Sequence, residues 1–218
     1  MGNIYMSYAK RLTRMVCGLF ICGLSVVLSI QAQLGLSPWN VFHMGISLLT
    51  DVTIGRVSIM VGFVIVIVDA VMKEKIGFGT VINMFLIGTF TDLIMNWNII
   101  PVPGSLVGRV CMMLVSIILN AYGIYLYISN GLGGGPRDSF MLVLLHRTKL
   151  KVYSARILME GTVLIIGWLM GGTVGIGTII AVLGTGPTLD MMFRLFKFDV
   201  GAVKHESIKD TLSKLKEG

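Results

Sequence analysis

Charged residues are scarce in this chain. Asp, Glu, Lys and Arg make up 13% of its 218 residues, whereas an average soluble domain carries about 25%. Hydrophobic residues make up 55%, and the mean hydropathy is +0.85. This composition excludes a disordered chain and argues strongly against a soluble globular domain. We therefore expect an all-α integral membrane protein of one domain.

Cysteine and histidine are also scarce. The three cysteines, Cys17, Cys22 and Cys111, lie in apolar runs without a CxxC pair or a Cys/His metal spacing, which predicts buried free thiols. The two histidines near the predicted membrane spans, His43 and His146, fall on opposite faces of the predicted topology and so cannot form one site. The sequence also lacks nucleotide-binding loops and nucleophile–base pairs. We expect no enzyme, no cofactor and no metal.

Long apolar runs predict six membrane-spanning helices, each of which needs about 20 mostly apolar residues. The predicted spans are 14–33, 57–72, 80–100, 106–129, 157–170 and 176–196. Of the 18 Lys and Arg residues, 16 then lie on the side of both termini, and only Arg56 and Arg109 lie on the other side. The positive-inside rule places both termini in the cytoplasm. The net charge of +7 thus indicates orientation in a plasma membrane rather than a nucleic-acid partner.

Basic residues also gather in two cytoplasmic segments. The loop 147–156 is predicted to contact anionic lipids, and residues 200–218 are predicted to form an amphipathic helix on the membrane surface. Association into a homo-oligomer is left open. Two charge pairs four residues apart predict ion pairs near the inner face: Asp69 with Lys73, and Arg156 with Glu160.

An internal repeat relates the two halves of the sequence. A shift of 98 residues places 11–92 on 109–190 without a gap, so that Arg11 falls on Arg109 and Pro38 on Pro136. The first repeat is 1–105 and the second is 106–199, and each holds three predicted spans. An odd number of spans forces the second repeat to enter the membrane from the opposite side. Inverted repeats of this kind are typical of transporters that alternate access between two faces.

Each repeat contains a glycine-rich turn, a proline and a short apolar helix, at 38–50 and 136–148. These helices are too short to span, so we expect them to be interfacial or re-entrant. Their N-terminal ends would attract an anion, and the topology predicts an outer vestibule with Asn40 and an inner one with Arg137 and Asp138. The alternative is that the turns only redirect the chain between spans.

Two aspartates at equivalent positions of the repeats, Asp92 and Asp190, lie within predicted spans. An intramembrane carboxylate is costly unless it faces a cavity or a partner. We predict that the two aspartates couple protons or bind cations. The alternative is that they lie in the headgroup zone or pair with Arg109 or Arg194.

The sixth span contains Pro187, which should kink or break the helix. Broken helices in mid-membrane are typical of solute sites. The candidate solute site also includes Gly186 of the same span and three residues of the third span, which are Asn83, Gly88 and Thr89. The alternative is that these residues only pack helices together.

The motifs LGLSPWN from Leu34 and GFGT from Gly77, with GLGGGPRD from Gly131 and GIGT from Gly175, resemble the YczE/YyaS/YitT group of bacterial multipass membrane proteins. The resemblance is greatest to YczE-like members and covers about residues 11–196. It implies a bacterial plasma-membrane protein and supplies no established substrate, cofactor or catalytic residue. Asn40 departs from the family pattern, in which aspartate is common.

Two functions are compatible with the sequence. The first is a transporter or channel for a small solute, which the repeat, the aspartates and the proline favour. The second is a non-transporting scaffold or regulator of another membrane complex, which the short loops and the basic tail favour. Deletion of 200–218 would separate them, because a transporter should keep uptake whereas a tail-based scaffold should lose its partner.

Overall fold

The computed structural model describes residues 2–74, 76–148, 151–199 and, in the tail, 206, 210 and 213. Within these residues the chain forms eight helices and no strand, which confirms the all-helical class. The helices are α1 (Gly2–Ala32), α2 (Pro38–Thr50), α3 (Ile54–Val71), α4 (Phe78–Trp97), α5 (Leu106–Ile128), α6 (Pro136–Thr148), α7 (Val152–Leu169) and α8 (Ile176–Leu195). The predicted amphipathic tail helix lies, apart from three residues, outside the described residues.

Short polar motifs set several helix starts. The hydroxyl of Thr53 accepts a hydrogen bond from the Arg56 N–H at the start of α3. At the starts of α4 and α8, the N–H groups of Gly77 and Gly175 donate to the hydroxyls of the threonines three residues later, at 3.3 and 3.2 Å. Each motif satisfies a backbone donor that the helix itself leaves unpaired.

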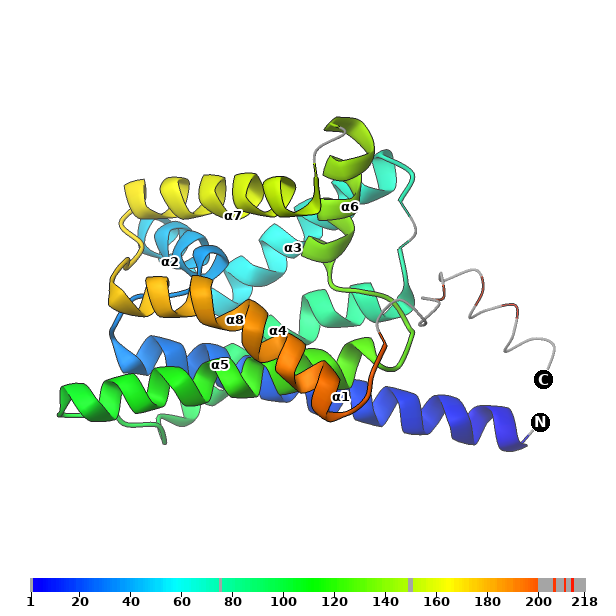
Figure 1. The fold of residues 1–218 in the computed structure, drawn as a ribbon, viewed down its shortest axis with the longest axis horizontal. Helices are drawn as coiled ribbons and strands as arrows, with labels where there is room; N and C mark the ends of the chain where they lie inside the picture. Colours follow the sequence, from blue (N-terminus) through cyan, green and yellow to red (C-terminus); the bar gives the residue numbers. More distant parts are fainter. Residues whose placement is uncertain are drawn as a thin grey trace.

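The helices form two layers, as Figure 1 shows. One layer contains α1, α4, α5 and α8, and the other contains α2, α3, α6 and α7. Each layer takes two helices from each half of the sequence. Glycines allow close packing within both layers: a Cβ on Gly18 of α1 would lie 2.8 Å from the carbonyl oxygen of Gly123 in α5, and a Cβ on Gly45 of α2 would lie 2.6 Å from that of Gly167 in α7.

The two halves of the chain are folded with the same spacing. Helices α2, α3 and α4 have 13, 18 and 20 residues, as do α6, α7 and α8. Among the hydrogen bonds between the halves, two backbone bonds form an equivalent pair: Gly79 N–H donates to Leu132 C=O, and Gly177 N–H donates to Leu34 C=O, each at 2.7 Å. The two bonds are equivalent under the shift of 98 residues. Each GxGT motif therefore packs its helix start against the glycine-rich turn of the other half.

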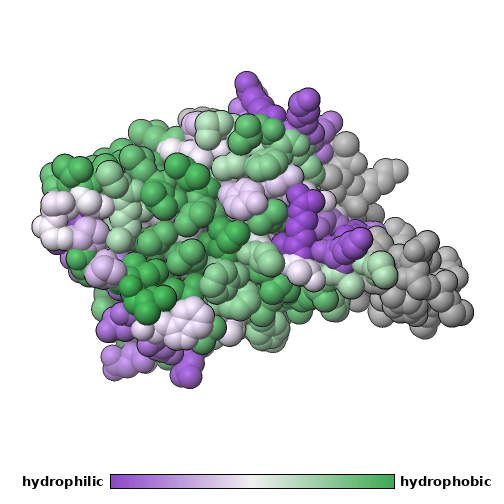
Figure 2. Space-filling view, turned by 90° about the horizontal axis from the view of Figure 1, so that it is seen from below, coloured by the Kyte–Doolittle hydropathy of each residue, from purple (hydrophilic) through white to green (hydrophobic). Residues whose placement is uncertain are grey.

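In the part of the chain that the structure describes, five helices are long and apolar enough to cross a membrane. They are α1 (from Tyr8), α3, α4, α5 and α8. Large apolar side chains on them point outward, for example Phe63, Val107 and Leu183. Figure 2 shows that one face of the molecule is mostly apolar, with hydrophilic residues gathered toward its two ends. Such a surface suits lipid rather than water. The sixth predicted span, α7, is not among the five and stays a prediction.

Helix α8 passes through Pro187 as one continuous helix, so the span is not broken there. The kink, which was the other expected effect of this proline, stays a prediction. Proline removes only one backbone donor from the helical ladder. Gly186, which precedes this proline, has no Cβ to clash with the proline ring.

Candidate functional site

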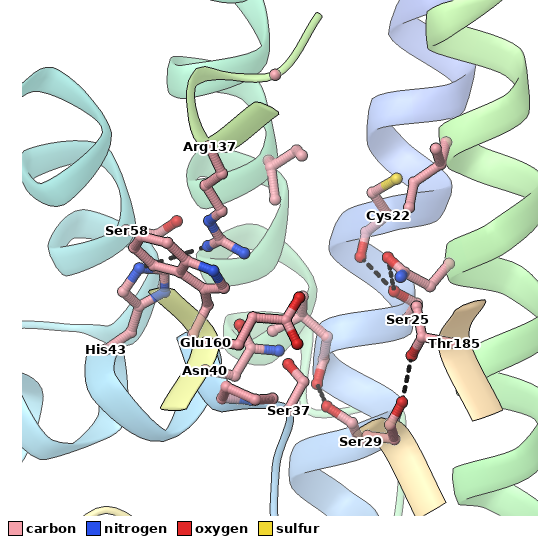
Figure 3. A pocket seen from close by; sticks show the side chains of 18 of the residues that line it. Cys22, Ser25, Ser29, Ser37, Asn40, His43, Ser58, Arg137, Glu160 and Thr185 are labelled. Carbon is pink, nitrogen blue, oxygen red and sulfur yellow. Dashed lines mark hydrogen bonds between the residues drawn. The ribbon is translucent and has the colours of Figure 1, made fainter. Parts of the chain in front are cut away.

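A cavity of about 470 Å³ lies between the two layers and is lined by residues of all eight helices. Figure 3 shows polar side chains that enter it from both layers. The residues that line it from the layer of α2, α3, α6 and α7 include Trp39, Asn40, His43, Ser58, Arg137 and Glu160. Those from the layer of α1, α4, α5 and α8 include Ser25, Ser29, Asn83, Asn120 and Thr185.

Two helices begin at this cavity. Ser37 and Pro38 line it at the start of α2, and Gly135 and Pro136 line it at the start of α6. Proline fits the first helical turn because the missing N–H has no helical partner there. The N-terminal end of a helix carries a partial positive charge. Both ends therefore add positive potential to the cavity.

Arg137 lies where the two short helices meet. Its guanidinium carbon is 4.6 Å from the centroid of the Trp39 ring, and its Nη2 is 3.5 Å from Nε2 of His43. Trp39 and Arg137 are equivalent positions of the predicted repeat. The predicted separation of these motifs into an outer and an inner vestibule is therefore wrong. The chain turns back after both α1 and α5, so that the two helix starts lie side by side.

The predicted ion pair between Arg156 and Glu160 is confirmed, with Nε and Oε1 2.9 Å apart. Both residues line the cavity, although the sequence had placed them at the membrane face. The Arg156 side chain is 49% exposed, so the cavity reaches the surface at the start of α7. Among the residues that the structure describes, the charged ones that line the cavity are Arg137, Arg156 and Glu160.

Asn83 is the most buried polar candidate from the sequence that lines the cavity. It is 7% exposed, and its side-chain amide makes no hydrogen bond within the described part of the chain. Several hydroxyl groups that line the cavity do make hydrogen bonds. Ser25, Ser29 and Thr185 donate to carbonyls of their own helices at 2.7, 2.7 and 2.6 Å. Asn83 thus keeps both a donor and an acceptor for a molecule in the cavity.

The structure does not bring the two predicted aspartates together. Asp92, at the end of α4, accepts hydrogen bonds from the Thr53 hydroxyl at 2.5 Å and from the Gly55 N–H at 2.9 Å. Asp190 pairs with Arg194 at 2.8 Å, as the alternative reading predicted, and its side chain is 60% exposed. Neither lines the cavity. These two hydrogen bonds satisfy the Asp92 carboxylate and link α4 to the start of α3.

The other predicted site residues divide between the cavity and the helix contacts. Asn40, Asn83, Arg137 and Gly186 line the cavity. Gly88 instead packs against Gly55 of α3. Thr89 is exposed and donates to the Phe85 carbonyl at 2.8 Å, and Pro187 does not line the cavity. The side chain of Asp138, like that of His146, lies outside the described residues.

The predicted ion pair between Asp69 and Lys73 is wrong. Asp69 is fully buried, and neither carboxylate oxygen has a hydrogen-bond partner within the described ranges. Helix α3 ends at Val71, and Lys73 follows it with a left-handed φ of 63°. Lys73 therefore does not occupy the helical i+4 position that the prediction assumed.

Several cavity residues were not predicted from the sequence, although a pattern pointed to them. Ser25 and Ser29 in α1, and Ser116 and Asn120 in α5, are polar pairs four residues apart within apolar spans. This spacing places each pair on one helix face. Within the described residues, no group of three or more His, Cys, Asp or Glu side chains could hold a metal ion.

Comparison with known proteins places this arrangement in a family. A model for a family of unknown function (DUF6198) matches residues 9–194. The chain belongs to this family. It is similar to the uncharacterized membrane protein YczE of Bacillus subtilis, with 37% identity over 81% of this chain and 82% of that one. It is also similar to an uncharacterized protein of Haemophilus influenzae, at 29% identity over 88% of both chains.

A third relative is the uncharacterized protein YyaS of Bacillus subtilis, with 26% identity over 76% of this chain and 83% of that one. The resemblance read from the motifs is thus confirmed for YczE and YyaS. No solved structure matches the chain.

Proposed function

We propose that this member of the DUF6198 family is a multipass protein of the bacterial plasma membrane that moves a small solute as a transporter or channel. The cavity between the two layers carries the proposal, because residues of all eight helices converge on it. Its polar lining is enclosed by helices whose outer surfaces are apolar. A polar cavity inside a membrane protein needs a polar occupant to compensate for the water that its groups have lost.

The inverted-repeat arrangement is part of this proposal. It is supported by the equal lengths of the paired helices and by the two reciprocal hydrogen bonds, Gly79 to Leu132 and Gly177 to Leu34. The contact of Trp39 with Arg137 supports it too. Equivalent residues of two symmetric halves touch only near the symmetry axis. The cavity therefore lies on the predicted pseudo-twofold axis, where inverted-repeat transporters bind solute.

The proposal requires α7 to be the sixth span and α2 and α6 to be re-entrant. Helix α7 has the 18 residues of α3, and it packs against α2 as α3 packs against α6. The starts of α2 and α6 are inside the cavity rather than at the molecular ends. With both termini in the cytoplasm, Arg156 would mark a cytoplasmic opening of the cavity.

The accessibility of the cavity from the two sides of the membrane tests this function without knowledge of the solute. The three native cysteines are replaced by alanine, and Thr185→Cys is introduced at the cavity wall. A membrane-impermeant maleimide is added to intact cells and, separately, to inside-out vesicles. A transporter or channel should be labelled from both sides, because its cavity communicates with each.

Thr89→Cys in the same background is the matched control, because Thr89 is exposed on α4 away from the cavity. It should resist the reagent from both sides. If Thr185→Cys is labelled from one side only, or from neither, the transport function is wrong. A scaffold or regulator of another membrane complex then becomes the better interpretation.

A further inference from the structure

Asp69 interrupts an apolar stretch of α3 with a carboxyl group that the structure buries completely. The residue is 0% exposed, and neither carboxylate oxygen has a hydrogen-bond partner within the described residues. An ionised carboxylate buried without a partner is so costly that the group takes up a proton instead. We propose that Asp69 is a proton-binding site. The proposal rests on the proposed function only in taking this proton as the one that couples the movement of the solute.

Asp69 lies beyond the cavity on the same face of α3 that lines it. Ser58, Gly62 and Ile65 of α3 line the cavity. Intervals of four, three and four residues put these three and Asp69 on one helix face. At about 1.5 Å per residue, Asp69 is about 6 Å further along α3 than Ile65, toward the end that the predicted orientation places in the cytoplasm. In that orientation the site lies between the cavity and the cytoplasm.

The other half of the chain indicates what this position contacts. Gly167 of α7 is the repeat equivalent of Asp69, and a Cβ on Gly167 would lie 2.5 Å from the Cα of Phe42 in α2. The equivalent neighbour of α3 is α6, since Ile65, one turn before Asp69, belongs to a buried cluster against which Phe140 of α6 packs. Glycine lets α7 and α2 touch at this position. Helix packing alone therefore does not require a carboxyl group on α3.

The charged groups nearest in sequence and at the end of α6 do not pair with Asp69. Glu74 donates its N–H to the Asp69 carbonyl at 2.9 Å and adds a second acidic side chain. Lys73 is exposed and has a left-handed φ of 63°. Arg147 is exposed at the end of α6, with its Nη2 3.5 Å from Sδ of Met72. No hydrogen bond from these described residues reaches the Asp69 carboxyl.

The other titratable groups on the helices that pack against α3 lie elsewhere. On α4, Asp92 accepts hydrogen bonds at the opposite end of α3, where Asp51 and Arg56 are exposed. On α2, His43 lies in the cavity with its Nε2 3.5 Å from Nη2 of Arg137 of α6. None of these described groups stabilises a negative charge on Asp69, so the protonated carboxyl is the favoured form. The side chains outside the described residues are those of Lys75, Asp138, His146 and Lys149.

The first test measures whether Asp69 is protonated in the membrane at neutral pH. Dicyclohexylcarbodiimide is an apolar reagent that reacts with protonated carboxyls: the O–H adds across one C=N bond, and the adduct rearranges to a stable N-acylurea. Membranes that contain the full chain are treated, and mass spectrometry identifies the modified peptides. Asp69 should be modified, and its rate should fall about tenfold for each pH unit above the midpoint of its titration. Asp190, which is exposed and paired with Arg194, is the internal control and should stay unmodified.

Asp69→Asn tests the same proton through stability. The amide has the shape of the protonated carboxyl but cannot ionise. Because the folded chain holds a proton that the unfolded chain releases, rising pH should favour unfolding of the unmodified protein. In an uncharged detergent, its thermal midpoint should fall relative to that of the variant by about 3 °C per pH unit through the neutral range. Asp51→Asn makes the same change at an exposed residue after α2 and should keep the pH dependence of the unmodified chain.

Three outcomes overturn the proton site. The first is an Asp69 that stays unmodified from acidic to neutral pH. The second is a folded Asp69→Asn chain that keeps the pH dependence of the unmodified one; if this variant fails to fold, the reaction of the unmodified chain still decides. The third is slower modification in sodium chloride than in choline chloride at one pH, which assigns the carboxylate to a sodium ion.

The proton site and the proposed function fail separately. If Thr185→Cys is labelled from both sides while Asp69 is unreactive, the proton site is wrong and the transport function stands. If Thr185→Cys is labelled from one side only while Asp69 reacts as expected, the transport function is wrong and the proton site stands.

Discussion

The junction between α3 and α4 and the junction between α7 and α8 are equivalent under the repeat but differ in structure. At the first, Gly55 and Gly88 are in contact, and Asp92 accepts hydrogen bonds from Thr53 and Gly55. At the second, no described atom lies within 4 Å of the Cβ position of Gly186. Asp190 pairs within its own helix instead of reaching α7. Within the described residues, the first junction is sealed and the second is open; the side chain of Tyr153, the repeat equivalent of Gly55, lies outside them.

This difference indicates how the cavity is closed on one side. Asp92 lies at the end of α4, which the predicted orientation places outside, while the exposed Arg156 lines the cavity near the predicted cytoplasmic face. In the orientation proposed above, the cavity would be closed to the outside and open to the cytoplasm. In an inverted repeat, the other state is reached when the two junctions exchange their conformations. Asp190 would then bind the start of α7 as Asp92 binds the start of α3.

The largest expected effect comes from locking the open junction shut. Lys151 is the repeat equivalent of Thr53, so Lys151→Cys with Asp190→Cys, in a chain without native cysteines, should form a disulfide when an oxidant is added to membranes. A disulfide needs Cα atoms about 4.4–6.8 Å apart, which the exchanged state would provide. The measurement is the loss of maleimide labelling at both cysteines, and mass spectrometry identifies the linked peptides.

The control pair is Lys151→Cys with Leu183→Cys. Leu183 is exposed on α8 and does not correspond to a residue that forms the sealed junction. It should stay reduced under the same conditions. A failure of the first pair to link, or equal linking in both pairs, contradicts the exchange of the two junctions.

The next effect comes from adding one methyl group to each junction. Gly88→Ala places a Cβ against the Gly55 carbonyl and should destabilise the protein by about 1–3 kcal/mol through overpacking. Gly186→Ala meets no described atom within 4 Å. Its gain in helix propensity, up to about 1 kcal/mol, is opposed by the Cδ of Pro187, which crowds a Cβ on the residue before it, so the net change should be small. Thermal unfolding of the two variants gives the size of each change, and equal destabilisation would show that the junctions do not differ.

A smaller effect is expected from Asp92→Ala. The variant removes both hydrogen bonds that fix the start of α3, a loss comparable to that of a helix cap, about 0.5–2 kcal/mol. The outer seal should weaken, so labelling of Thr185→Cys from outside should become faster. A slower or unchanged outside rate would show that Asp92 does not hold the seal.

The sequence predicted the spans better than the site. Apolar length alone located five membrane helices, and the shift of 98 residues predicted matching helix lengths within the two halves. It did not predict that Trp39 and Arg137 touch, because their contact depends on how the two halves pack and not on either half alone. The two aspartates were predicted as site residues because they are charged residues within apolar runs, yet local hydrogen bonds satisfy the Asp92 carboxylate.

The residues that the sequence undervalued share a physical reason. Glu160 was expected to form a helical pair and does so at 2.9 Å, but a one-dimensional pattern does not tell which way the pair faces. Ser25 and Ser29 are small and only moderately polar, and Asn120 is a single polar residue in a long apolar run. Their importance appears only when the opposite layer supplies Arg137.

The smallest effect on stability is expected from Asp190→Ala, the counterpart of Asp92→Ala. An exposed ion pair four residues apart contributes about 0.5 kcal/mol or less, and the Asp190 side chain is 60% exposed. The unfolding midpoint should therefore hardly move. Asp190 should nevertheless matter in the other state, where it would seal the cytoplasmic side. Labelling of Thr185→Cys from outside should thus become slower in Asp190→Ala, opposite in direction to Asp92→Ala. Rates that change in the same direction in both variants would show that the two aspartates do not hold opposite seals.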